Sequence, residues 1–221
     1  MAKNDIKIDN KMKTIITNDW LKEFSFFKKT RPCLLEKRIG PLEISFGYEV
    51  RYGVDILISI SYFNLSNPLN FMCANLRTRP AYRNRLTWVQ HEQGKYKEAA
   101  QELREQCPIP IEGPVTLSQI IRAYRENPIL EYLISQRELE DPALIAAWAG
   151  KIDLAKECLD WAKPYYDKRF QTATNRRTEE WYQWMLEKIS DPEKLQQTVE
   201  EQLVFHKLTK IPYEELIIDI E

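Results

Sequence analysis

The N-terminal half of the chain alternates apolar and polar residues in a way that predicts antiparallel strands. Segment 43–65, EISFGYEVRYGVDILISISYFNL, contains two alternating runs separated by Tyr52-Gly53. Because glycine adopts a positive φ at little cost, we expect a hairpin turn at this position. Further candidate strands cover residues 33–38, 70–79 and 85–91.

A helix is expected before these strands. Segment 18–29, NDWLKEFSFFKK, places Trp20, Phe24 and other apolar residues at helical spacing. Asn18 or Asp19 can cap its first turn, and Pro32 limits its extent. This helix can cover one face of the sheet, as a sheet with an apolar face requires.

From about residue 93 the apolar spacing becomes helical. Asp141-Pro142 is typical of a helix start, and Gly150 is typical of a left-handed helix end. Segment 141–163 is therefore expected to form an antiparallel helix pair, which Pro164 should end or kink. The other predicted helices cover 94–107, 116–127 and 129–140, a segment that begins near Thr178, and a segment from Asp191-Pro192 to about Lys207.

These patterns predict an α+β protein with an N-terminal antiparallel sheet packed with a helix, followed by a C-terminal helical subdomain. The proline-rich segment 108–114 marks the boundary, so residues 1–110 form the α+β domain and residues 111–221 the subdomain of antiparallel helix pairs.

The net charge changes sign at the same boundary. Residues 1–110 contain 18 Lys and Arg and 12 Asp and Glu, a net charge of +6, whereas residues 111–221 contain 14 and 21, a net charge of -7. This asymmetry suits a charged partner, two domains, or docking between the halves.

Composition places the chain among ordinary globular proteins, with 43% hydrophobic and 29% charged residues. No apolar run approaches the roughly 20 residues that span a bilayer. The N-terminal sequence MAKNDIKIDNKMK lacks the apolar core of a secretion signal. We therefore expect a cytoplasmic protein with no membrane partner.

The sequence contains no motif of a known catalytic or cofactor site. Glycine-rich phosphate loops, G-x-S-x-G and H-E-x-x-H are absent. The four cysteines form no C-x-x-C pair and lie far in sequence from His91 and His206, so we expect buried, reduced thiols and no metal. We expect no cofactor and no catalytic residue, with an enzyme of unrecognised type as an alternative.

Acidic residues with neighbouring tryptophans are the candidates for partner binding. Acids near a helix start interact favourably with the helix dipole, so a structural role is the simpler interpretation. Trp181, Trp184 and Met185 form a stripe at helical spacing that suits the protein core or, if exposed, an interaction hot spot. The candidate partner-binding residues are Glu138, Glu140, Asp141, Glu179, Glu180, Trp181, Trp184 and Glu187.

Nucleic-acid binding is an alternative, through the basic segment 77–85, RTRPAYRNR. Arginines with an interleaved aromatic residue can hold phosphates and stack on a base. A solvated loop, or docking against the acidic half, also accounts for the segment, and the domain as a whole is not strongly basic. The candidate residues are Arg77, Arg79, Tyr82, Arg83 and Arg85.

The overall layout resembles the small cytoplasmic immunity proteins of bacterial polymorphic-toxin and contact-dependent growth inhibition systems. The resemblance covers most of the chain: the helix with Trp20 and Phe24, the strands around GYEVRYGVDILISISYF, and the acidic helical tail. It implies a non-enzymatic protein that binds one cognate toxin domain, for example a nuclease, and blocks its active site. The acidic C-terminal half would then imitate phosphate and speed association.

Overall fold

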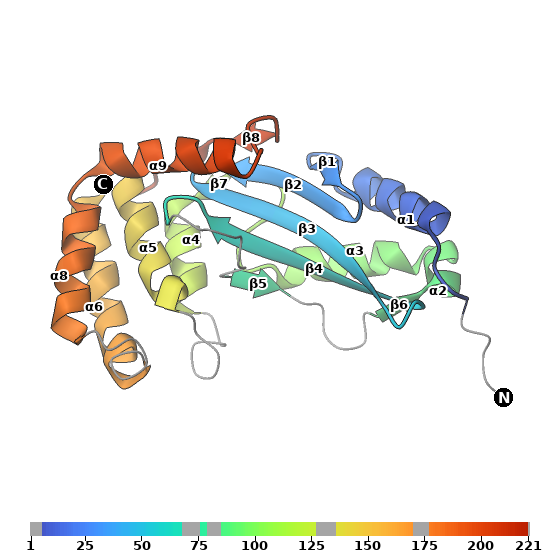
Figure 1. Ribbon diagram of the computed structural model, residues 1–221, viewed down its shortest axis with the longest axis horizontal. Coiled ribbons are helices and arrows are strands. Elements are labelled where there is room, and N and C mark those ends of the chain that lie inside the picture. Colours follow the sequence, from blue (N-terminus) through green and yellow to red (C-terminus); the bar gives the residue numbers. More distant parts are fainter. Residues whose placement is uncertain (1–5, 68–75, 79–84, 127–135, 170–176, 221) are drawn as a thin grey trace.

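The computed structural model describes residues 6–67, 76–78, 85–126, 136–169 and 177–220. It confirms the α+β class, with an N-terminal antiparallel sheet followed by a helical region (Figure 1). The helices are α1 (Asn10–Glu23), α2 (Trp88–Glu92), α3 (Lys95–Gln106), α4 (Leu117–Arg125), α5 (Gln136–Trp148), α6 (Ile152–Arg169), α8 (Thr178–Ile189) and α9 (Pro192–Phe205). The strands are β1 (Lys28–Arg31), β2 (Leu34–Ile39), β3 (Leu42–Arg51), β4 (Asp55–Asn64), β5 (Leu76–Thr78), β6 (Arg85–Thr87), β7 (Val115–Thr116), β8 (Tyr213–Glu214) and β9 (Leu216–Ile217).

The sheet is built around the predicted hairpin. Strands β3 and β4 pair antiparallel over their full length, and both Tyr52 and Gly53 in the turn have a positive φ. The strand order is β1-β2-β3-β4-β5, with β6 also pairing with β4 and β8 pairing with β2. Period-2 alternation therefore predicted this part of the fold correctly, because each strand turns one apolar face to the core.

The first helix covers the apolar face of the sheet, as expected, but its predicted limits are wrong. Helix α1 begins at Asn10, where the Asp9 side chain accepts a hydrogen bond from the Met12 amide, and ends at Glu23. The rings of Trp20 and Phe24 pack against Phe46 of β3 in tilted arrangements, at ring-centroid distances of 4.8 and 5.2 Å. Residues 28–31 instead form the edge strand β1, since pairing with β2 satisfies their backbone groups.

Two further boundaries differ from the prediction. Segment 85–91 is a strand only as far as Thr87, whose side chain caps the short helix α2 together with Gln90. Asp141 does not start a helix, because α5 runs through Asp141 and Pro142 from Gln136. The Asp141 carboxylate is turned inward, where it accepts a hydrogen bond from Asn64 of β4 at 3.1 Å.

The helix pair α5 and α6 forms as predicted, with Gly150 at a φ of 75° between the two helices. Helix α6 does not end at Pro164 but continues to Arg169. Helix α9 begins as predicted, with Asp191 accepting a hydrogen bond from the Lys194 amide at 3.0 Å. In Figure 1 these helices lie at the end of the molecule opposite to α1 and α2.

The C-terminal segment contacts both halves. Strand β8 pairs parallel with β2, and β9 pairs parallel with β7. The buried Lys37 of β2 donates a hydrogen bond to Glu214 at 2.9 Å, and the main hydrophobic core extends from α1 and the sheet to α8. Among the described helices, none has the length and apolar character to cross a bilayer.

Candidate functional site

The predicted acidic residues of α5 lie inside the protein. Glu138, Glu140 and Asp141 are buried, and Glu140 accepts hydrogen bonds from Asn67 at 3.2 Å and from the Trp181 indole at 3.1 Å. These three candidates for partner binding therefore do not lie on the surface, because α5 continues through them, and Glu140 and Asp141 accept hydrogen bonds from asparagines at and just after the end of β4.

The predicted residues of α8 are divided between the core and the surface. Trp181 is buried and stacks on Tyr166 at 4.2 Å, and Trp184 is half-buried. The three acids Glu179, Glu180 and Glu187 are exposed. Glu179 forms an ion pair with Lys163 at 3.0 Å, and Glu180 accepts a hydrogen bond from the Arg177 amide at the helix start. Glu180 therefore has a structural role at the start of α8, and Trp181 belongs to the core.

The arginine cluster is only partly described. Arg77 on β5 is the register partner of Ser61, and Arg85 on β6 is the register partner of Leu57. Arg79, Tyr82 and Arg83 lie outside the described residues. Both ends of the segment therefore join the same strand, β4, and its nucleic-acid role stays a prediction.

A patch at the end of α9 was not predicted from the sequence. Val204 and Phe205 are 68% and 62% exposed, and Tyr213 on the adjacent β8 is exposed as well. The Arg38 guanidinium lies 4.3 Å from the centre of the Tyr213 ring and 3.5 Å from Glu200, one helical turn before Val204. We call these five residues the C-terminal patch. The sequence does contain a sign of this patch. Residues 195, 199 and 203 of α9 recur at a helical spacing and face the core, and Val204 and Phe205 do not belong to that series.

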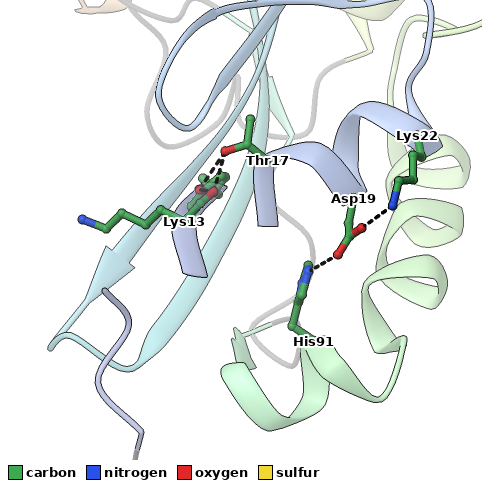
Figure 2. A network of polar contacts seen from close by, with 6 residues as sticks. Lys13, Thr17, Asp19, Lys22 and His91 are labelled. Carbon is green, nitrogen blue, oxygen red and sulfur yellow. Dashed lines mark hydrogen bonds and ion pairs between the residues drawn. The ribbon is translucent and has the colours of Figure 1, made fainter. Parts of the chain in front are cut away.

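A pocket lies between α1 and the turn that joins α2 to α3. Its cavity has a volume of about 380 Å³, and its lining includes Ile15, Asp19, Trp88, His91 and Tyr96. Figure 2 shows Asp19 between His91 and Lys22, with a contact to each. The Asp19 Oδ2 atom lies 3.2 Å from His91 Nε2, and Oδ1 accepts a hydrogen bond from Lys22 Nζ at 2.9 Å.

The electrostatics of the pocket favour an ionised aspartate and a neutral histidine. Burial acts to raise the pKa of Asp19, but hydrogen bonds from Lys22 and His91 outweigh it and the pKa is lowered. Burial lowers the pKa of His91, although Asp19 opposes the shift. The His91 side chain is only 1% exposed, so its imidazole is poorly placed to contact a substrate as a catalytic base.

A second titratable pair is enclosed by the fold. Glu36 on β2 and Glu43 on β3 are both buried, and neither carboxylate oxygen of Glu43 has a hydrogen-bond partner. Burial raises the pKa of both groups.

Within the described ranges, His, Cys, Asp and Glu side chains form no group of three or more that could hold a metal ion. Of the cysteines, Cys158 is buried and Cys33 and Cys107 are half-buried, while Cys73 lies outside the described residues.

Comparison of the chain with protein-family models, with curated proteins and with solved structures gives no match.

Proposed function

We propose that this protein is an inhibitor that binds a cognate bacterial toxin domain, as the immunity proteins that its layout resembles do. The observation that carries the proposal is the C-terminal patch, where Val204, Phe205 and Tyr213 expose apolar and aromatic surface beside Arg38. Aromatic residues and arginine dominate the energetic centres of protein interfaces. A cluster of this kind, next to charged residues, is typical of a binding surface.

The enclosed titratable groups support binding rather than catalysis. His91 and Glu43 have shifted pKa values, but their side chains are at most 1% exposed. A catalytic acid or base must reach the substrate within hydrogen-bond distance. The exposed acids Glu179, Glu180 and Glu187 on α8 provide the second surface of the proposal, because negative charge would steer a nuclease toxin with a basic cleft. Action in the cytoplasm is part of the same proposal.

The test begins with capture of partners from the native host by the tagged protein, with nuclease treatment. We expect one stoichiometric protein that survives the treatment, is toxic when produced alone, and is neutralised by co-production of this chain. Recovery of nucleic acid, or loss of the partner after nuclease treatment, would support the arginine segment instead. A captured protein with no toxicity would overturn the inhibitor proposal.

Two variants then locate the surface. The double change Val204→Ser and Phe205→Ser removes exposed apolar groups, so we expect the protein to fold normally. Its affinity for the partner should fall by about tenfold or more. The matched change Glu179→Lys and Glu180→Lys reverses charge on α8 and is expected to slow association more than it speeds dissociation. Unchanged binding by both variants would exclude both surfaces. Surface plasmon resonance of full-length chains separates the two rates.

A further inference from the structure

Asp19 lies on the polar wall of the pocket between α1 and α2. Asp19 is a carboxylate whose side chain is 18% exposed, whereas the Lys22 side chain that binds its Oδ1 atom is 73% exposed. The ammonium group of Lys22 therefore approaches Asp19 from the solvent side. A cation entering through the pocket could take its place at Oδ1, because a surface ion pair of this kind is weak.

The remaining charges of the pocket nearly cancel. Glu92 and Lys97 belong to its lining and carry opposite charges, so Asp19 gives the lining a net charge of -1, which Lys22 balances from outside the lining. His91 does not add a positive charge, because burial keeps its imidazole neutral, and a carboxylate acceptor at Nε2 selects the Nε2–H tautomer. An anion would meet Asp19 and Glu92 without a compensating imidazolium.

The opposite wall is aromatic. His91 stacks on Tyr96 at a ring-centroid distance of 4.6 Å and lies 6.1 Å from Trp88, nearly parallel to both rings. The faces of aromatic rings attract cations, most strongly where a carboxylate is close by. Ile15 on α1 is 40% exposed and belongs to the same lining, so an alkyl chain has an apolar surface to cover.

We infer that this pocket binds an alkylammonium or alkylguanidinium group, with Asp19 as the counter-ion and the half-buried Tyr96 ring as the wall, since Trp88 and His91 are buried behind it. Two sources carry this chemistry, a free small amine and a lysine or arginine side chain of another protein. The inference is independent of the proposed function, since the pocket lies beside α1 and α2, apart from α8, β8 and the end of α9 (Figure 1).

The test is an NMR titration of the isotope-labelled full-length protein with butylguanidinium, with butyrate as the probe of opposite charge. We expect saturable shifts at Gly94 and at the indole of Trp88 with the cation and none with butyrate. An arginine-containing blocked tripeptide forms the second arm. Binding of the tripeptide as well as butylguanidinium indicates a protein side chain as the source, and binding of butylguanidinium alone indicates a free amine.

Variants at Asp19 and Lys22 separate this site from non-specific binding. Asp19→Asn should abolish the shifts, with thermal unfolding as the check that α1 and α2 still pack. Lys22→Met should tighten binding by about two- to fivefold, the factor that corresponds to removal of a competing surface ion pair. Lys95→Met is the matched control, because Lys95 is exposed and pairs with Glu98 at 2.7 Å outside the pocket lining. Equal shifts with butyrate, absence of shifts with the cation, or unchanged affinity in the Lys22 variant would overturn the assignment.

Discussion

Replacing Glu43 with glutamine is expected to stabilise the protein at neutral pH and to leave its stability nearly unchanged near pH 4. Glu43 has 0% of its surface exposed, and its carboxylate oxygens lack hydrogen-bond partners. Burial raises the pKa of Glu43 well above its ordinary value of 4.5, the neighbouring Glu36 raises it further, and Arg31 opposes the shift. The fold therefore favours the neutral carboxyl group.

The magnitude follows from proton linkage. A carboxyl group with a pKa of 4.5 in the unfolded chain must take up a proton to enter the fold at neutral pH, which costs about 1.4 kcal/mol for each pH unit above that pKa. The cost therefore has a ceiling of roughly 3 kcal/mol at pH 7. Because the folded state binds more protons than the unfolded state, the wild-type protein loses stability as the pH rises above 4.5. Glutamine does not titrate, so we expect it to raise the free energy of unfolding by about 1–3 kcal/mol at pH 7.

Urea denaturation followed by circular dichroism, at several pH values between 4 and 8, measures this effect. The quantity of interest is the difference in unfolding free energy between variant and wild type, which should grow with pH. Glu49→Gln is the matched control, because Glu49 lies on the same strand with its side chain 64% exposed and pairs only with Arg51 at 3.3 Å among the contacts described. A difference for Glu43→Gln that is zero or independent of pH would show that this carboxylate is ionised in the fold and would refute the reasoning.

Four further substitutions test other contacts by the same denaturation assay. Glu214→Ala should lower the free energy of unfolding by about 1–3 kcal/mol, because it leaves the fully buried Lys37 ammonium without its partner. Lys37→Met should lower it less, because it leaves only the partly exposed Glu214 carboxylate. Equal losses in the two variants would contradict this. Trp181→Phe should cost about 1.5–3 kcal/mol, since it removes the buried indole hydrogen bond to Glu140, and a neutral result would show that water replaces the indole. Asp191→Ala should cost about 1 kcal/mol through loss of the helix cap, unless the start of α9 is held by packing alone.

The candidate sites show which features local sequence patterns can predict. The exposed acids of α8 were found from composition, since charged residues beside a helix start remain near solvent. Local patterns made Glu140 and Asp141 candidates for partner binding, because the sequence gives no sign that Asn64, at the end of β4, and Asn67, just after it, donate hydrogen bonds to them. The Asp19–His91 pocket joins residues 72 positions apart, and no spacing rule connects such a pair.

The sequence by itself determined the elements whose signals lie within a few neighbouring residues. The β3–β4 hairpin follows from alternation around Tyr52-Gly53, and the start of α9 follows from Asp191 and Pro192. Only the tertiary structure decided that residues 28–31 become an edge strand, and that the short strands β8 and β9 attach to β2 and β7. These choices depend on hydrogen bonds and packing with segments that are distant in the chain, and such contacts override local preference because they bury more surface than a single turn can.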